Sequence, residues 1–177
     1  MPNWCENNLT IQHKDKDKIE SILKTVESCL NHKATKDFEE TDKKNTYVGL
    51  LQSLVPMPKE LEGTTKPGDE PNWYDWCCEN WGCKWDIYEY YTHEPKLEYD
   101  GELYFIELGF DTAWSPPVEA YKKLEKMGYH IYATFLEAGF DYVGRYTEGV
   151  DTTYSLDDVP KTDKELYEYV QDWRAED

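Results

Sequence analysis

The sequence predicts an α+β sandwich in which an antiparallel sheet carries two helices on one face. Apolar residues recur at steps of three and four over residues 19–30, which is typical of an amphipathic helix. Residues 102–114 alternate between apolar and polar, as in a strand with one buried face. A second helix opens with Pro116 and Pro117 and ends at Gly128. The resulting order of strand, helix, strand, strand, helix, strand is the ferredoxin-like βαββαβ topology.

The four strands of this topology are assigned to short segments rich in β-branched and aromatic residues. We expect them at 7–12, 84–92, 102–114 and 130–138, with a turn-forming Asp-Gly pair between the second and third. The helix after the third strand is expected to be capped by Ser115. Eight apolar side chains should then form the core: Ile22, Val26, Ile106, Leu108, Phe110, Leu124, Ile131 and Phe135.

Two additions extend this framework. An insert at about 31–83 contains a tryptophan-rich helix, together with an apolar segment at 47–58 that is ambiguous between strand and helix. The C-terminal extension, 151–177, contains a helix at about 162–174 that follows a capping box. We therefore divide the chain into a ferredoxin-like domain over 1–150 and a strand/helix extension.

Charge is the strongest signal of composition. The chain has 37 acidic and 19 basic residues, a net charge of −18. Residues 1–50 are nearly balanced at −1, so almost the whole excess lies in residues 51–177, at −17. Such a field repels phosphate backbones and anionic membranes. We therefore expect no direct DNA binding and no membrane contact, and a partner protein that is itself basic.

The start of the chain and its cysteines predict the compartment. The stretch "MPNWCENNLT" has neither the basic start nor the apolar centre of a signal peptide. No apolar run approaches the ~20 residues that span a bilayer. The five cysteines are an odd number without the spacing of a disulfide framework. These features predict a protein of the reducing cytoplasm of its host cell.

Five motifs together carry a family resemblance. They are "MPNWCENNLTI" at 1–11, "PMP" at 56–58, "ENWGCKWD" at 79–86, "FDTAWSPP" at 110–117 and "EAGFDYVG" at 137–144. In this order they resemble the YubB ferredoxin-like domain family, which is carried by phages and plasmids and has no established activity. The resemblance implies a ferredoxin-like fold and an origin on a mobile genetic element. It supplies no catalytic residues, and Cys83 stands where the family would have threonine.

Four of the seven tryptophans fall within residues 73–85. One interpretation is a pocket whose rings stack on a flat ligand, because ligand sites combine aromatic walls with a few polar groups. The other is that large rings dock the insert on the sheet, and we expect this role for Trp81. The candidate binding residues are Asn80, Trp81, Lys84, Trp85, Asp86 and Trp114.

Cysteine spacing argues against a metal site. Zinc sites use paired ligands two to four residues apart. Cys78 and Cys83 fit the wide end of that range, but neither Cys5, Cys77 nor His93 supplies a second pair. No cysteine stands in a local signature of a nucleophile either. We expect no metal and no cofactor.

Three residues are candidates for catalysis. Asp111 and Glu137 each end a strand, and neighbouring strand ends could bring both carboxylates to one cation that activates water. His130 begins a strand and could act as a general base in RNA cleavage. We favour solvated or hydrogen-bonded strand ends as the explanation of these residues, because a base must be placed as well as present. We therefore favour a protein that is not an enzyme.

One face of a ferredoxin-like sheet is free of the two framework helices. Tyr88 and Tyr90 could share that face with Tyr132 and stack on RNA bases. RNA-binding sheets of this kind also carry basic residues, and this half of the chain is strongly acidic. The terminal helix, with Leu166 and Trp173, could cover the face instead.

Three functions remain open. The first is an acidic mobile-element protein that binds and inhibits a nucleic-acid-processing complex of host defence, in the manner of an anti-CRISPR protein. It would occupy the basic groove of an RNA-guided nuclease, which is built to hold an anionic backbone. The second is a small nuclease or phosphoesterase acting on RNA or a nucleotide. The third is a binder of a small molecule or nucleotide at the tryptophan-lined site. We favour the first, because only it explains the charge asymmetry.

Overall fold

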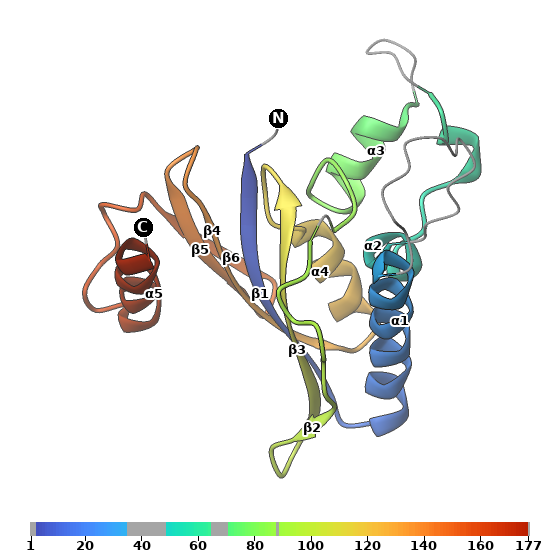
Figure 1. Cartoon of the computed structure of the whole chain (residues 1–177), viewed down its shortest axis with the longest axis horizontal. Helices are drawn as coiled ribbons and strands as arrows, with labels where there is room; N and C mark the ends of the chain where they lie inside the picture. The colour runs from blue at the N-terminus through green and yellow to red at the C-terminus, as the bar shows by residue number, and fades with distance from the viewer. Residues whose placement is uncertain (1–2, 35–48, 65–70, 88, 177) are drawn as a thin grey trace.

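The protein is a layered α+β structure built on a single six-stranded antiparallel sheet (Figure 1). The computed structural model describes residues 3–34, 49–64, 71–87 and 89–176. The strand order is β2-β3-β1-β4-β5-β6. The strands are β1 (Trp4–His13), β2 (Glu98–Tyr99), β3 (Tyr104–Ala113), β4 (His130–Glu137), β5 (Tyr142–Thr147) and β6 (Val150–Tyr154). The predicted α+β class is confirmed, and β2-β3-β1-β4 is the order of a ferredoxin-like sheet.

Two helices cover one face of the sheet, as expected. They are α1 (Lys16–Ala34) and α4 (Val118–Lys126), which lie side by side in Figure 1. The insert adds the short helices α2 (Leu50–Leu54) and η1 (Lys59–Leu61), then α3 (Trp73–Asn80). The ambiguous segment at 47–58 therefore contains a helix in its described part, whereas 35–48 and 65–70 lie outside the described residues.

The core lies between the sheet and these helices. All eight predicted core residues are buried, with exposed fractions of 4% or less. Leu9 and Ile11 of the central strand β1 join them, in contact with Ile19 of α1 and Leu124 of α4 within one cluster. The apolar side chains that alternate along the strands and those at helical spacing in α1 therefore pack together in one layer. This is why the core could be predicted from the sequence.

The predicted strand over 84–92 is wrong. In its described part this segment forms no strand with β3: it makes an isolated bridge between Tyr90 and Phe110 and hydrogen bonds between Thr92 and Gly109. The edge strand is the two-residue β2 further along the chain. The cause lies in Asp86, whose carboxylate accepts hydrogen bonds from the backbone amides of Leu51 and Gln52 in α2. The same carboxylate also bonds its neighbour's amide, and such local bonds compete with a strand ladder.

The predicted cap of α4 is also wrong. The residue before the helix is Pro117, and no side chain caps it. The Ser115 hydroxyl instead donates to the carbonyl of Gly82, at 2.7 Å. This bond joins the turn after α3 to the start of α4. Gly82 there has φ of +91°, and an added Cβ would lie 3.0 Å from the backbone of Val118, so glycine is required.

The C-terminal extension belongs to the same sheet. Strand β6 pairs with β5, and α5 (Lys164–Glu176) lies on the side opposite to α1 and α4 (Figure 1). There Leu166 and Val170 of α5 pack against Leu136 of β4 and Val143 of β5. The expectation that the terminal helix covers part of the second face is confirmed. Within the described residues, none of the helices has the length and apolar character of a membrane span.

Candidate functional site

The side of the sheet opposite to α1 and α4, here called the open face, is apolar beneath α5 and mainly polar elsewhere. Side chains of a strand alternate between faces. Leu9 and Ile11 of β1 point into the helix-covered core, so Asn8 and Thr10 point to the open face. Cross-strand pairing places Glu107 of β3 beside Thr10 on this face. Helix α5 packs on β4 and β5, and its Tyr169 reaches Asn8 of β1. On β1 and β3, the open-face residues Asn8 and Glu107 are exposed, whereas Gly109 and Asp111 are buried.

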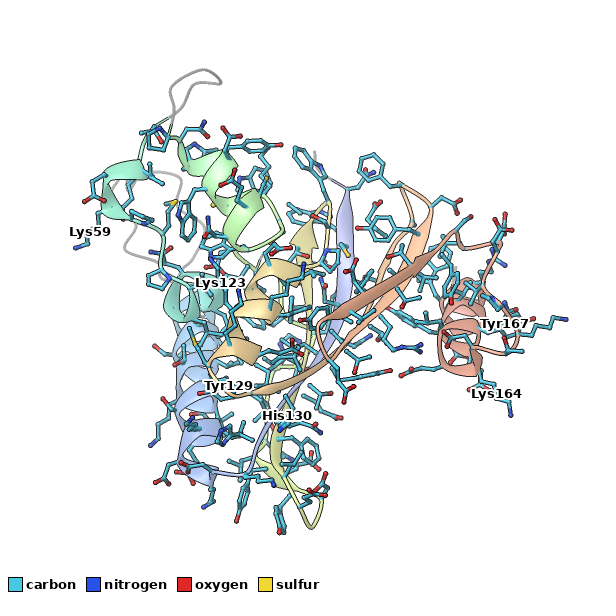
Figure 2. All side chains as sticks on the ribbon, turned by 180° about the vertical axis from the view of Figure 1, so that it is seen from behind. Lys59, Lys123, Tyr129, His130, Lys164 and Tyr167 are labelled. Atoms are coloured by element: carbon cyan, nitrogen blue, oxygen red, sulfur yellow. The ribbon has the colours of Figure 1, made fainter. Side chains whose placement is uncertain are left out.

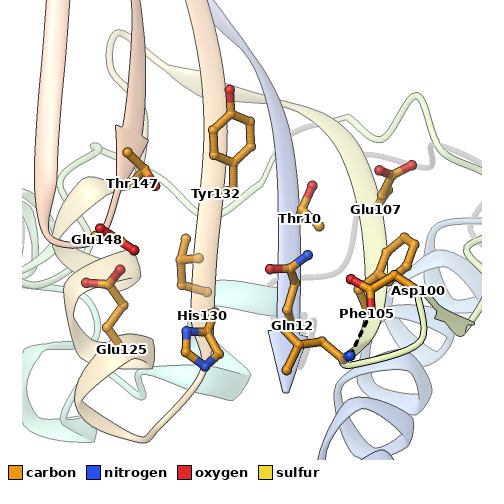
Figure 3. Close-up of a pocket in the computed structure, with 12 residues that line it drawn as sticks. Thr10, Gln12, Asp100, Phe105, Glu107, Glu125, His130, Tyr132, Thr147 and Glu148 are labelled. Atoms are coloured by element: carbon orange, nitrogen blue, oxygen red, sulfur yellow. Dashed lines mark hydrogen bonds between the residues drawn. The ribbon is translucent and has the colours of Figure 1, made fainter. Parts of the chain in front are cut away.

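A cavity of about 480 Å³ opens at the end of the sheet where His130 pairs with Gln12, and it extends from the open face to Glu125 of α4 (Figure 3). His130 and Tyr132 of β4 and Gln12 of β1 line it from the sheet. Four carboxylates also line it, and we call the cavity the acidic groove: Asp100, Glu107, Glu125 and Glu148. Because these carboxylates come from four separate segments of the chain, the groove exists only in the folded protein.

Two of the groove carboxylates are held by hydrogen bonds. Asp100 accepts from the backbone amides of Leu103 and Glu102, both at 2.8 Å, and these bonds lower its pKa. Glu125 accepts from the hydroxyl of Tyr146, at 2.7 Å. In contrast, Glu107 and Glu148 are exposed side chains. The groove therefore combines two carboxylates held by hydrogen bonds with two that are exposed.

A second acidic pair lies further along the open face. Glu6 of β1 and Asp111 of β3 are direct cross-strand partners, and Asp111 is only 7% exposed. Burial raises the pKa of the Tyr91 hydroxyl, and so does its hydrogen bond to Asp111. Burial likewise raises the pKa of Tyr169 in α5, assisted by the charge of Glu6. The open face is therefore acidic at both ends and carries tyrosines beside its carboxylates.

The arginine on this face is neutralised. Arg145 of β5 donates two hydrogen bonds to Asp163, both at 3.0 Å, and a third to Glu165 at 3.1 Å. The bonds to Asp163 raise the pKa of Arg145. Tyr132 has its pKa raised by burial and by a hydrogen bond to Glu165. This network ties the start of α5 to the sheet and leaves the open face with a negative balance.

The candidate catalytic carboxylates lie on opposite faces of the sheet. Asp111 and Leu136 are both partners of Glu6, and Glu137 follows Leu136, so its side chain points to the helix-covered face. There Glu137 is 1% exposed and accepts hydrogen bonds from the amides of Gly139 and Phe140. This geometry contradicts the hypothesis that Asp111 and Glu137 bind one cation.

The third catalytic candidate, His130, is remote from Asp111. It is the partner of Gln12 at one end of β1, whereas Asp111 is the partner of Glu6. Six residues of strand separate these positions, or roughly 20 Å at the usual rise per residue. Figure 2 shows His130 near the end of the sheet, where its side chain is exposed. The structure therefore does not bring the three catalytic candidates together.

The tryptophan region is used mainly for packing. Trp81 is 4% exposed, and its indole N–H donates to the carbonyl of Val55 at 2.8 Å. Trp76 meets it edge-to-face, with ring centroids 5.7 Å apart. Asn80 accepts a hydrogen bond from Lys123 of α4, at 2.5 Å, and Asp86 holds the start of α2. Trp81 docks the insert as expected, and the proposed polar anchors bind separate parts of the fold.

The remaining binding candidates form a separate cluster. The Lys84 ammonium lies 4.4 Å from the ring centroid of Trp85 and 4.5 Å from that of Trp114. Trp4, which the sequence did not single out, lies beside Trp85 at 6.4 Å. Trp85 is 38% exposed. Lys84 therefore lies between two tryptophans distant in sequence, and a third, Trp4, packs beside Trp85.

Thiol chemistry and metal binding receive no support. Burial raises the pKa of Cys77 to about 12, and it raises the pKa of Cys5 and Cys83 as well. Such thiols carry little thiolate at neutral pH and are poor nucleophiles. Across the described residues, no group of three or more His, Cys, Asp or Glu side chains is arranged to hold a metal ion.

The tyrosine platform expected for RNA is not formed as predicted. Tyr90 is 3% exposed and packs on Phe110, with ring centroids 6.3 Å apart, on the core side. Tyr88 lies outside the described residues. Tyr132 does lie on the open face, but the groove around it is lined by carboxylates. Repulsion between these carboxylates and phosphates disfavours RNA there.

Sequence reasoning missed the acidic groove itself. Glu107 could have been found, since it breaks the apolar pattern of β3 on the face away from the core. Glu148 lies in a hairpin turn with Gly149, where both residues have positive φ. Asp100 lies in the turn before β3, and its role there is visible in sequence. Their convergence follows from the sheet order, which no local pattern encodes.

Comparisons with known proteins do not identify a family for this chain. A scan against family models found no match, and neither did a search of curated proteins. Among solved structures, the chain is similar to the crystal structure of a protein api92 from Yersinia pseudotuberculosis, family-model DUF1281. The TM-score is 0.46 and the sequence identity 10%, over 88% of this chain and 99% of that one. The function must therefore be argued from the site.

Proposed function

We propose that this protein is an acidic binding protein whose open face engages a basic surface of a partner protein. The observation that carries the proposal is the acidic groove, where four carboxylates surround a cavity of about 480 Å³. Positive side chains entering such a groove would be attracted over a distance set by the ionic strength. Glu6, which is partly exposed, adds a further carboxyl group along the face, next to the buried Asp111.

The partner that we propose is a nucleic-acid-processing complex of host defence, most specifically an RNA-guided nuclease. The channel of such an enzyme is lined with Lys and Arg to hold a phosphate backbone. Surface carboxylates can occupy the same positions and so block the channel. The resemblance to a family carried by phages and plasmids favours this target over other basic proteins. In this proposal the protein acts by binding and inhibits without catalysis.

Aromatic side chains would supply the anchors of this interface. Tyr132 and Phe105 line the acidic groove beside the carboxylates, and Tyr91 is 49% exposed next to Asp111. Aromatic residues are frequent among the side chains that dominate binding energy. Charge would then govern the rate of association and its salt dependence, and the tyrosines would govern the lifetime of the complex.

The test combines inhibition with matched charge removal. An RNA-guided nuclease loaded with its guide is assayed for DNA cleavage with the purified protein at low and high salt. The variant Glu107→Gln/Glu148→Gln removes two exposed groove carboxylates. Its control, Glu27→Gln/Glu79→Gln, removes two exposed carboxylates from α1 and α3. We expect inhibition by the wild type and the control, weaker inhibition by the groove variant, and loss of inhibition as salt rises.

The enzyme alternative gives a different result in the same experiment. Purified protein that shortens RNA on its own, with the activity abolished by His130→Ala or Glu137→Gln in a folded variant, would replace our proposal. Equal inhibition by the groove and control variants would refute the placement of the interface. Absence of inhibition across a panel of RNA-guided nucleases would refute the target class, and capture of a different basic protein would redirect it.

A further inference from the structure

Three tryptophans and a lysine form a cluster at the opposite end of the sheet from the acidic groove. Lys84 lies between two indoles, with its ammonium 4.4 Å from the centroid of Trp85 and 4.5 Å from that of Trp114. The ring of Trp4 is tilted by 44° against Trp85, at 6.4 Å. We call Trp4, Trp85 and Trp114 the tryptophan cage. Its arrangement is that of an aromatic site for a cation, occupied by a side chain of the same protein.

The fold places Trp114 in the cage at the cost of an unfavourable backbone. Trp114 has φ of +73°, a left-handed conformation that bulky residues rarely adopt. Its amide donates to the carbonyl of Asn3, at 3.0 Å, and its carbonyl accepts from the hydroxyl of Tyr142, at 2.7 Å. Both bonds hold the strained residue against the start of β1. Strain of this kind clusters at sites that clamp ligands.

The charge of Lys84 is held by rings rather than by carboxylates. The chain has 37 acidic residues, yet among the described residues the ion pairs recorded do not include Lys84. Tryptophan offers the strongest attraction of the aromatic side chains to a cation over its face. Trp85 is 38% exposed, so the cage is open to solvent on one side. Another cation can therefore reach the rings if Lys84 moves aside.

We propose that the tryptophan cage is a binding site for an arginine side chain of the basic partner, with Lys84 as an internal occupant that the arginine displaces. The claim that the arginine belongs to a basic partner rests on the proposed function, whereas the affinity of the cage for a guanidinium does not. A guanidinium is planar, stacks on aromatic faces and is more weakly hydrated than an ammonium. It can therefore replace the lysine between Trp85 and Trp114 with a smaller loss of hydration. Lys84 keeps the cage closed to weaker cations.

The test uses a small peptide, so that it does not depend on the partner. The probe is a capped Gly-Arg-Gly peptide, and its neutral counterpart carries citrulline, which has the shape of arginine without the charge. Binding is followed by tryptophan fluorescence and by NMR shifts of the indole N–H groups. The variant Lys84→Ala empties the cage. The control, Lys123→Ala, removes a lysine that lies 5.5 Å from the ring of Trp76 outside the cage (Figure 2).

We expect Lys84→Ala to bind the arginine peptide about tenfold more tightly than the wild type, because an internal occupant reduces the free fraction of the site. The citrulline peptide should not bind, and Lys123→Ala should behave as the wild type. The proposal is overturned if folded Lys84→Ala binds no better than the wild type, or binds citrulline equally well. If Lys84→Ala does not fold, Lys84→Gln, which removes the charge and keeps most of the side-chain length, is judged by the same criteria.

The outcome is separable from that of the proposed function. Failure of nuclease inhibition leaves the peptide result intact, since the peptide carries a single arginine and needs no nuclease. Failure of peptide binding with intact inhibition would restrict the interface to the acidic groove. In wild-type protein, a peptide-induced shift of the indole signals of Trp85 and Trp114 would locate the arginine at the cage directly.

Discussion

The two faces of the sheet are built from the same strands but differ in the side chains that they present. On the helix-covered face, apolar side chains of β1, β3 and β4 pack against α1 and α4. Two buried polar groups there are hydrogen-bonded: the Asn7 amide nitrogen donates to the Thr112 hydroxyl at 2.9 Å, and Glu137 accepts from two backbone amides. On the open face, Glu107 and Glu148 are exposed, and the carboxyl groups of Glu6 and Asp111 stand side by side, with Asp111 only 7% exposed.

This difference separates stability from function. Like charges placed opposite each other destabilise a sheet, so a protein gains nothing in stability from pairing Glu6 with Asp111. The helix-covered face contributes apolar burial and satisfied hydrogen bonds to folding. The open face carries a negative field that suits a basic partner. Substitutions on the two faces should accordingly differ in what they change.

The largest effect is expected on the helix-covered side, at Trp81. Trp81→Ala removes a large ring that is 4% exposed and the hydrogen bond to Val55, so it should lower the free energy of unfolding by ~3–5 kcal/mol. Trp85→Ala is the control and should cost only ~1 kcal/mol, because Trp85 is 38% exposed. Urea denaturation of both variants measures the difference, and equal costs would show that Trp81 is not the anchor of the insert.

An intermediate effect is expected where α5 joins the open face. Arg145→Met removes the two bonds to Asp163, a pair whose side chains are 25% and 14% exposed, and should cost ~1–2 kcal/mol. The control Arg174→Met removes a more exposed pair with Asp157 and should stay within ~0.5 kcal/mol. Hydrogen exchange should accelerate in α5 of Arg145→Met and not in β1. Unchanged exchange in α5 would show that apolar packing alone holds it.

The smallest effect on stability is expected in the acidic groove. Glu107→Gln should change the free energy of unfolding by less than ~0.5 kcal/mol, since the side chain is exposed. Its neighbour Leu108 points to the core, and Leu108→Ala should cost ~2–5 kcal/mol. Thermal melting of the two variants compares adjacent residues on opposite faces. A large loss of stability from Glu107→Gln would mean that the groove contributes to folding, contrary to the expectation that stability depends on the helix-covered face.

Prediction from sequence succeeded where local pattern and burial coincide. The alternation of apolar residues in β3 and their helical spacing in α1 identified the buried residues, because each period shows which side of the element faces the core. It failed at 84–92, where aromatic residues favour a strand but Asp86 uses its carboxylate to hold α2. The candidate site shows the same division. The charge excess indicated a basic partner, but the groove that concentrates the charge was not located.

The sequence by itself determined the α+β class, the core, the acidity of residues 51–177 and the burial of Trp81. It could do so because composition and periodicity indicate which side chains of a segment are buried and which are exposed to water. Only the tertiary structure decided which distant residues meet. It placed Asp111 and Glu137 on opposite faces, since strand alternation combines with register in a way that neither strand encodes alone. It also brought Trp4 to Trp85 and enclosed Lys84 between two indoles. Contacts of this kind depend on strand order and loop paths, and these are selected by the packing of the whole chain.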